Sequence, residues 1–545
     1  MGKLYEQLKK IKSFFKSDDK KNQLPIENFR SDDFNLKKTS LKNSNSINVS
    51  TRGNLKVSIP VKEVIKNSTN LVDLELKPLI LNKSPLTEEI NSNTFLEKKL
   101  YRKHFFKFPE PWVAKGGNTQ ISDNNVNSFI DIYIGIDFGT SFTKAAIGLM
   151  DKVYPVDWQG ISNFELRYLL PSEYCRFPDN SVFIGQHPEA DSTSFKSDLK
   201  LPFINQKNPS TEEIEQASIF LALITRYIRA WTYHNFSNLV DKKNIRWHLN
   251  IGAPSNGLED TKLKTTYLNL CKYAWDISNL ESSHLVGKSN LNNHFEGLDL
   301  SSFEVFPEFV AQMAGYMQSS QRIPGLHALI DVGGGTLDVV TYIVHQDEEK
   351  EDVFPFLVPK VEPLGTQMLN IKRFEIKEVR EQKLEIDELS PILDTSSFAK
   401  VASVSSEIVA KVDDDFSEKI SQLITSVFSK TKNRRYRLSN AWETGVRTFF
   451  TGGGSNSTLY LNAIQKAKSQ SKGGLILTLL PKHPKLDKFI GDDRDYQRIS
   501  VACGLAQDSL NLGKVRPAKE VKDDIPKYHA QTIRERLDRD DLYAK

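Results

Sequence analysis

The sequence has little cysteine and no long apolar run. Its three cysteines, Cys175, Cys271 and Cys503, are far apart, odd in number and outside any metal-ligand or redox spacing. This pattern argues against a disulfide framework and indicates buried thiols in a reducing compartment. No stretch approaches the roughly 18 apolar residues that a membrane-spanning helix needs, and the N-terminal lysines are not followed by the apolar region of a secretion signal. We therefore expect a cytoplasmic protein without an integral membrane segment.

Metal-ligand motifs and nucleic-acid signatures are also missing. The ten histidines include no HExxH or similar metal-ligand pair, so we expect His104 and His327 to be packing or surface residues. One basic aromatic cluster, at residues 101–108, is more typical of a docking segment than of a nucleic-acid interface. Nucleic-acid binding is therefore not expected.

Charge divides the chain into two dissimilar parts. Residues 1–130 hold 23 Lys and Arg against 14 Asp and Glu, a net charge of +9, whereas the remainder carries −5. The first 17 residues predict a short basic amphipathic helix, with its apolar stripe at Leu4, Leu8, Ile11 and Phe15. Residues 18–100 have the Asn-, Ser- and Lys-rich composition of a poorly packed tail. We assign residues 1–125 as a basic, mostly disordered extension that contacts a protein partner, with weak peripheral membrane contact as the alternative.

Beyond this extension the sequence has the pattern of an α/β protein. Residues 128–139 and 143–150 are two β-rich runs around a tight turn, which predicts a hairpin. Residues 327–344 repeat the pattern of strand, glycine turn and strand, which indicates two internally similar lobes. The expected boundaries are 126–325 for the first lobe, 326–525 for the second, about 345–435 for a helical subdomain within it, and 526–545 for a charged tail.

Three further segments carry helix signals. Ser210 and Thr211 precede acidic residues and apolar positions at helical spacing, which predicts a long helix over residues 209–231. Residues 447–467 predict a strand, a glycine turn and a helix, and residues 497–510 predict a last helix.

The first motif with chemical meaning is Asp-Phe-Gly-Thr-Ser-Phe-Thr-Lys, which begins at Asp137. Gly139 exposes backbone N–H groups in the turn, and the hydroxyls of Thr140 and Ser141 can bond phosphate oxygens. A carboxylate would repel phosphate, so the natural role of Asp137 is to hold Mg²⁺ or its waters, while Lys144 supplies positive charge. Taken alone, this motif is equally well explained as an ordinary hairpin turn.

The second motif has the same order of residue types and begins at Asp331. It contains Gly333, Gly334, Gly335 and Thr336. A triphosphate carries more charge than one turn can neutralise, and two facing turns from two lobes can clamp it around a metal ion. The pair of motifs therefore favours a nucleotide site over chance duplication.

These motifs resemble those of the actin/Hsp70/sugar-kinase ATPase superfamily. The second motif is very similar to the phosphate-2 motif of Hsp70 proteins, and the first looks like phosphate-1, with its lysine placed as in the actin branch. Residues 307–316 are similar to the first connecting helix, in which Glu308 falls where the family keeps a carboxylate or glutamine that positions the attacking water. Residues 451–455 resemble the adenosine motif, and residues 501–506 look like the second connecting helix. The five segments occur in the family's order over residues 131–515.

The resemblance implies a fold, a ligand set and a site. The implied fold is α/β, a two-lobed actin-like ATPase with duplicated ribonuclease-H-like lobes, so that the two lobes of residues 126–325 and 326–525 are ATPase lobes. The implied cofactors are ATP or ADP and Mg²⁺. The implied catalytic residues are Asp137, Lys144, Glu308 and Asp331, of which Asp137 and Asp331 hold Mg²⁺ through water. The implied nucleotide-binding residues are Gly139, Thr140, Ser141, Gly333, Gly334, Gly335, Thr336, Gly452, Gly453, Gly454 and Ser455.

The sequence departs from the Hsp70 pattern in three places. Only about 40 residues follow the second connecting helix, so a chaperone that grips substrate with a peptide-binding domain is not expected. The lysine that Hsp70 proteins place in the first lobe has two candidates here, Lys196 and Lys200, and each is equally well explained as a surface lysine. The helix that sandwiches adenine in Hsp70 is not recognisable in residues 405–430, so base specificity rests on the glycines of residues 452–454. No sugar-binding signature is present.

Three functions are consistent with this sequence. The favoured one is an Hsp70-like, chaperone-like ATPase that hydrolyses ATP slowly to ADP and phosphate and acts as a nucleotide-dependent switch for a protein partner. The second is an actin-like protein that forms ATP-dependent filaments. The third is a binding module that holds nucleotide without turnover.

Overall fold

The computed structural model describes 13 segments of the chain. The chain divides into two units, residues 1–77 and 78–545, and every described residue belongs to the second. The predictions for residues 1–125, 101–108 and 526–545 therefore concern residues outside the described ones. The described segments are 129–158, 167–178, 182–185, 193–197, 199–205, 209–240, 244–254, 261–279, 303–346, 352–382, 392–512, 514–516 and 518–521.

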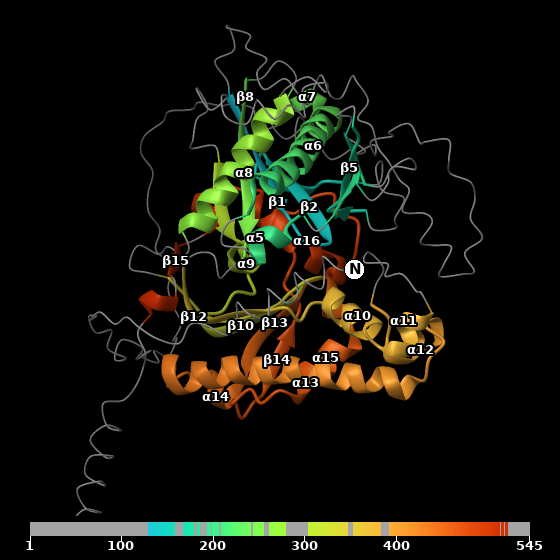
Figure 1. Ribbon diagram of the computed structural model, residues 1–545. Helices are drawn as coiled ribbons and strands as arrows, with labels where there is room; N and C mark the ends of the chain where they lie inside the picture. Colours follow the sequence, from blue (N-terminus) through green and yellow to red (C-terminus); the bar gives the residue numbers. More distant parts are fainter. Residues whose placement is uncertain are drawn as a thin grey trace, which may run out of the picture. The chain divides into compact units, whose positions relative to one another are not determined.

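The first half of the described unit is built on a mixed six-stranded sheet (Figure 1). Its main order is β3-β2-β1-β8-β9, and β4 pairs with β2. The strands β3, β2 and β1 are antiparallel, whereas β1, β8 and β9 run parallel. The bounds are β1 Phe129–Asp137, β2 Phe142–Leu149, β3 Lys152–Pro155, β4 Leu170–Pro171, β8 Asn244–Ala253 and β9 Phe303–Pro307.

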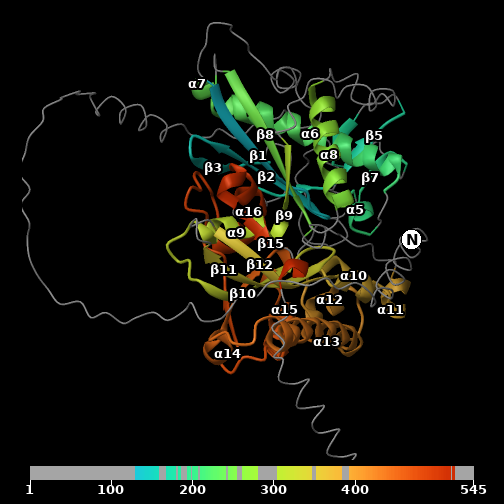
Figure 2. The same ribbon diagram turned by 90° about the vertical axis from the view of Figure 1, so that its left-hand side faces the viewer.

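Helices α6 (Thr211–Asn235) and α8 (Thr261–Asn279) pack together beside this sheet (Figure 2). The predicted start of α6 is confirmed, since Ser210 and Glu213 form a capping box in which each side chain bonds the backbone N–H of the other. Most of α6 is buried, which explains why its apolar residues extend around the helix. Smaller elements complete this half: β5 Tyr174–Arg176, β6 Val182–Ile184, β7 Phe195–Lys196, α5 Leu201–Asn205 and α7 Ser237–Val240.

The second half contains another mixed six-stranded sheet, in the order β14-β13-β10-β11-β12-β15. Here β12, β11 and β10 are antiparallel, while β10, β13 and β14 run parallel. Five strands of each sheet thus share one connectivity and one pattern of strand directions. This confirms an α/β chain with an internal repeat. The bounds are β10 Gly325–Val332, β11 Leu337–Gln346, β12 Asp352–Glu362, β13 Val446–Thr451, β14 Leu475–Thr478 and β15 Lys514–Arg516.

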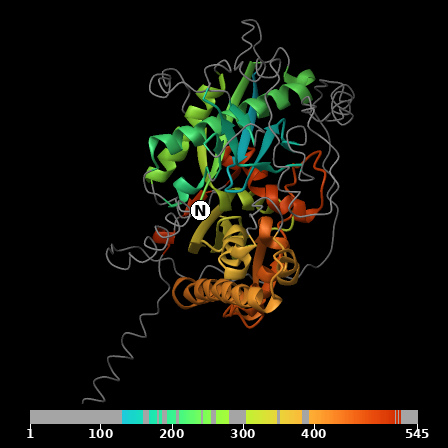
Figure 3. The same ribbon diagram turned by 45° about the vertical axis from the view of Figure 1, so that its right-hand side comes forward.

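Helices cover the second sheet, and the longest is α13, drawn in orange in Figure 3. The prediction that residues 345–435 are helical is wrong for β12, which is a strand rich in β-branched and aromatic residues. Charged residues at its two ends hid this strand, although residues 353–358 between them are buried. The elements are α10 Thr366–Phe374, α11 Lys377–Glu381, α12 Thr395–Val401, α13 Ser406–Lys430, the π-helix η5 Thr431–Arg435, α14 Ala441–Thr444, η6 Gly453–Asn456, α15 Thr458–Lys466, η7 Ser509–Leu512 and η8 Ala518–Glu520.

The two halves are joined through helices α9 (Glu308–Met317) and α16 (Asp493–Leu505). These helices cross in direct contact at Gly504, where a Cβ atom would overlap the carbonyl oxygen of Ala311. Helix α16 also lies against β1 because Gly135 has no side chain there, and a Cβ at that position would overlap the backbone of α16. The helix predicted at residues 307–316 is therefore confirmed as α9, and the one predicted at residues 497–510 is confirmed up to Leu505, where α16 ends.

Burial bears out two smaller expectations, on the cysteines and on His327. The cysteines are free and buried, as predicted. His327 is a packing residue, 1% exposed, and its imidazole hydrogen-bonds the hydroxyl of Tyr316. Within the described segments, no helix has both the length and the apolar character needed to cross a bilayer.

Candidate functional site

The hairpin of β1 and β2 places an acid opposite a base at its turn. Asp137 and Lys144 are register partners, and the Lys144 Nζ lies 3.0 Å from the Asp137 Oδ2. Ser172 fixes the turn between them, because its hydroxyl donates to the Gly139 carbonyl (2.8 Å) and its N–H donates to the Ser141 carbonyl (2.9 Å). The first turn is thus held in shape by an ion pair on one side and a serine on the other.

The hairpin of β10 and β11 places two acids in the equivalent register positions. Asp331 faces Asp338 directly, an arrangement that is unfavourable for like charges. Burial raises the pKa of Asp331 to about 6, and the charges of Glu308 and Asp137 add to the increase, while a hydrogen bond from Gln312 opposes it. Burial also raises the pKa of Asp338 to about 8, helped by the charges of Asp331 and Glu308. The raised pKa values show that both carboxylates are unfavourable in their charged forms here, and a bound cation would stabilise the charged forms.

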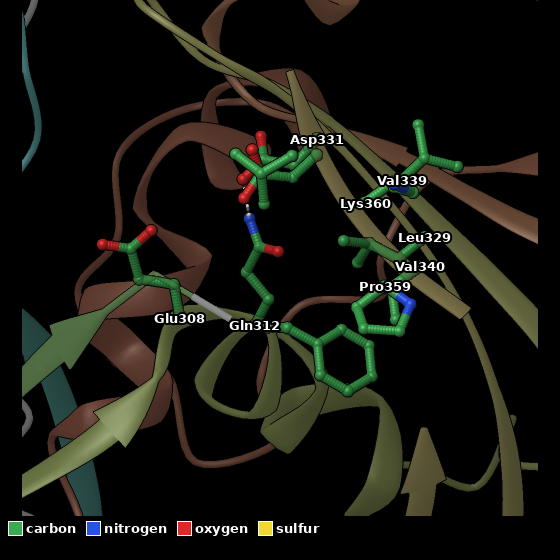
Figure 4. Close-up of a pocket in the computed structure, with 11 residues that line it drawn as sticks. Glu308, Gln312, Leu329, Asp331, Val339, Val340, Pro359 and Lys360 are labelled. Atoms are coloured by element: carbon green, nitrogen blue, oxygen red, sulfur yellow. Dashed lines mark hydrogen bonds between the residues drawn. The ribbon is translucent and has the colours of Figure 1, made fainter. Parts of the chain in front are cut away.

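Helix α9 contributes two polar residues one turn apart. The Gln312 side chain donates a 2.7 Å hydrogen bond to the Asp331 Oδ2, and the Glu308 carboxylate lies beside this pair (Figure 4). The Lys200 Nζ donates to the Glu308 Oε1 at 2.5 Å. Burial alone would lower the pKa of Lys200, but the charges of Glu308, Tyr267 and Asp137 more than offset burial and raise it. Lys200 is therefore a buried cation, 4% exposed.

The two turns touch each other. A Cβ on Gly334 would overlap the Ser141 hydroxyl, and a Cβ on Gly335 would lie 3.6 Å from the Thr140 Oγ1. Within the second turn, the Gly333 N–H donates to the Thr336 carbonyl at 2.9 Å. Because both turns carry hydroxyls and glycines, their meeting point is suited to phosphate oxygens.

A third glycine turn follows β13. Gly452 has φ +88°, and a Cβ there would overlap the Asp331 carboxylate, so only glycine suits both the backbone angle and the close approach. The Ser455 hydroxyl donates to the Gly452 carbonyl at 2.8 Å. Ser455, expected to bind nucleotide, thus stabilises the turn itself in this structure. Gly454 packs against Val332, where a Cβ would overlap the valine side chain.

Two cavities adjoin these turns. The smaller, about 10 Å³, has room for about one water molecule and is lined by Glu308, Gln312, Asp331 and Asp338 among others (Figure 4). The larger, about 360 Å³, lies beyond the third turn between α13 and α15. Its lining includes Asp414 and Ser417 of α13 and Asn456, Ser457 and Asn462 around the start of α15.

The acidic groups fit a hydrated cation better than a bare one. Within the described segments, no group of three or more His, Cys, Asp or Glu residues is arranged as a complete metal shell. However, the Asp338 Oδ1 is buried and accepts no hydrogen bond, and Asp338 is the register partner of Asp331 across the hairpin. An unsatisfied carboxylate oxygen beside a second carboxylate suits Mg²⁺ that keeps several of its waters.

The structure brings the expected catalytic residues together. Coulombic coupling joins Asp331 to Asp137, Glu308 and Lys144. Of the two candidate lysines, the structure brings Lys200 to the site, since Lys200 pairs with Glu308. Lys196 is a half-buried residue of β7. Sequence reasoning did not assign Asp338 or Gln312 to the site. The available signals were that Asp338 mirrors Lys144 in the hairpin register and that Gln312 follows Glu308 by one helical turn.

In comparisons with known proteins, no family model and no curated protein matches the chain. The function is therefore argued from the geometry of the site.

Proposed function

We propose that the protein is an Hsp70-like member of the actin/Hsp70/sugar-kinase ATPase superfamily. It binds ATP with Mg²⁺, hydrolyses it slowly to ADP and phosphate, and uses the nucleotide state as a conformational switch for a protein partner. One observation carries the proposal: two hairpin turns from sheets of the same connectivity meet at Ser141 and Gly334, surrounded by carboxylates and two lysines. The actin-like two-lobed fold is part of this proposal, supported by the repeated strand order.

The residues of the two turns bind the phosphate chain. Backbone N–H groups and the hydroxyls of Thr140, Ser141 and Thr336 donate to phosphate oxygens. Asp137, Asp331 and Asp338 hold Mg²⁺ through its waters, and the metal supplies charge neutralisation on the phosphate oxygens when bound. Because phosphoryl transfer depends on positioning and charge neutralisation, a site without a strong base gives slow turnover.

The attacking water is oriented from helix α9. Glu308 accepts from Lys200 through Oε1, and its other carboxylate oxygen is available to accept a hydrogen bond from water. Gln312 holds Asp331 in position at 2.7 Å. Glu308 thus acts as a water-positioning residue that Lys200 holds in place.

The nucleobase occupies the larger cavity beyond the third glycine turn. Its volume of about 360 Å³ suits a base and ribose, and its lining includes Asn456 and Ser457, shortly after the glycines. Arg373 belongs to its lining but is already engaged, because its guanidinium donates two 2.7 Å hydrogen bonds to Asp413. Base selection therefore falls to the other polar groups of the lining, among them Asp414, Asn456 and Asn462.

We infer that the exchange of ATP for ADP alters the relative position of the two halves through the crossed helices α9 and α16. Both carry groups near the site, and their contact at Gly504 leaves no room for a side chain. The partner contact is assigned to residues 1–125 on their net charge and amphipathic start. Deleting these residues is expected to abolish partner capture and to leave ATP hydrolysis intact.

Titration calorimetry of the full chain tests the binding claim. ATP and ADP should both bind, and chelation of Mg²⁺ should weaken each. Hydrogen exchange of α9 and α16 should then differ between the ATP and ADP states. Absence of binding would contradict the proposal, and pelleting of the protein with ATP would favour the filament alternative.

A further inference from the structure

Arg498 lies in helix α16 at the junction of two turns of the proposed site. Its Cζ stands 5.8 Å from the ring centroid of Phe142, the residue that follows Ser141 in the first hairpin. Its Nε and Nη2 lie 3.8 Å and 3.9 Å from the place where a Cβ of Gly453 would be. One guanidinium thus borders both the first phosphate turn and the third glycine turn.

Within the described segments, Arg498 forms neither a hydrogen bond nor an ion pair, and its contact with Phe142 is a cation–π contact. The side chain is half-buried. Burial lowers its pKa, which the charge of Asp495 partly offsets, but an arginine keeps its charge in proteins. A partly desolvated guanidinium with five donors and no acceptor is a group that a ligand anion would stabilise.

The charges around the turns explain why a further cation is needed. Lys144 is paired with Asp137 and Lys200 with Glu308, so both lysines already neutralise carboxylates. Asp331 and Asp338 add further acidic groups. A triphosphate with one Mg²⁺ retains negative charge, and it would enter a site whose lysines are engaged.

The neighbours of Arg498 indicate which part of a nucleotide it meets. Phe142 belongs to the first phosphate turn, and Gly453 directly follows Gly452, which lies over the Asp331 carboxylate. The lining of the larger cavity includes Asn456 and Ser457, which follow these glycines, but it includes neither Gly453 nor Arg498. The guanidinium is therefore at the phosphate end of the site.

We propose that Arg498 is a phosphate-binding residue that donates a forked pair of hydrogen bonds to the phosphate chain of a nucleoside di- or triphosphate. This inference rests on the proposed nucleotide site and adds a positive residue from α16 to it. Since α16 also contacts β1 and α9, the bond links ligand phosphate to the crossed helices.

The test compares Arg498→Gln with wild type in calorimetric titrations of the full chain with ADP, ATP and adenosine, each with Mg²⁺. We expect ADP and ATP affinity to fall at least tenfold, which is about 1.4 kcal/mol, and adenosine affinity to change less than twofold. Arg498→Lys should give an intermediate loss, because it keeps the charge and loses the fork. Arg494→Gln is the matched control, since Arg494 is exposed in the first turn of the same helix, and it should bind like wild type.

The outcomes separate this inference from the proposed function. Wild-type ADP affinity in Arg498→Gln, or an equal loss for ADP and adenosine, would overturn the assignment of Arg498 and leave the nucleotide site standing. If wild type binds neither ADP nor ATP, both proposals fail. Thermal melting without nucleotide monitors folding. If Arg498→Gln is unstable, Arg498→Lys is titrated with ADP at high and at low salt. Wild-type affinity of Arg498→Lys at both salt concentrations would contradict a phosphate contact.

Discussion

Lys200 donates a 2.5 Å hydrogen bond to Glu308, a residue 108 positions later in the chain. The loop before α5 and the first residue of α9 are thus held together by a buried ion pair next to two further carboxylates. Such a pair is costly to break, because removing one partner leaves an uncompensated charge. Its location places a positive charge beside the carboxylate that lies nearest Asp331 and Gln312 on α9.

Replacing Lys200 by Met should lower both stability and ATP turnover. The free energy of unfolding is expected to fall by about 3 kcal/mol, the usual scale for breaking a buried pair, and turnover should fall at least tenfold. Lys196→Met is the control, since Lys196 makes no ion pair with Glu308. Chemical denaturation and phosphate release measure the two effects. Equal behaviour of the two variants would contradict the selection of Lys200.

Replacing Glu308 by Gln should reduce hydrolysis more than ADP affinity. A residue that orients water acts mainly in the transition state, so kcat should fall tenfold or more while the Kd for ADP changes less than threefold. Steady-state kinetics and calorimetry provide the two numbers. A parallel loss in both would mean that Glu308 has a structural role.

The buried imidazole of His327 should make the protein sensitive to acid. Burial lowers the pKa of His327 to about 4, below the unfolded value of about 6.5. Its contribution to stability is therefore complete above pH 6.5 and is lost as the pH falls through 4, by at most about 3 kcal/mol. Urea unfolding at pH 7 and pH 4.5 measures this loss, and His327→Phe should show a smaller difference between the two pH values. An identical difference in the variant would show that other groups cause the acid sensitivity.

The crossing of α9 and α16 predicts a strong steric effect at Gly504. A side chain there would overlap the Ala311 carbonyl, so Gly504→Val should force the helices apart and cost more than about 3 kcal/mol of stability. Gly453→Ala is the matched comparison, because the nearest atom to its Cβ would be the Arg498 Nε at 3.8 Å. Thermal melting of the two variants should separate them clearly; similar melting temperatures would contradict the helix contact.

The repeated hairpins and the capped helix α6 could be predicted from local sequence, because each depends on residues close together in the chain. The contact between α9 and α16 could not, since it joins Ala311 to Gly504, far apart in the sequence. The start of α6 needs only Ser210 and Glu213. Strand β12 was missed because the charges at its ends outweighed its β-branched interior. The pairing of Lys200 with Glu308 could not be predicted, since Lys196 and Lys200 have the same local pattern and only tertiary structure buries Lys200.

The pair of Asp331 and Asp338 is a second case in which local sequence does not predict which residues share a site, here within one motif. Both residues are visible in the sequence, but their register across the turn decides that they share one local environment. The expected role of Asp331 remains a prediction, and Asp338 joins it only because the hairpin register places the two side by side.

The central claim is that the two turns form a working ATPase site. Its most direct test is phosphate release by the full chain with ATP and Mg²⁺, compared with Asp331→Asn. The account predicts slow, Mg²⁺-dependent release by the wild type and at least a tenfold lower rate in the variant, about 1.4 kcal/mol or more in barrier height. Equal rates in the two proteins, or no release by the wild type, would contradict it.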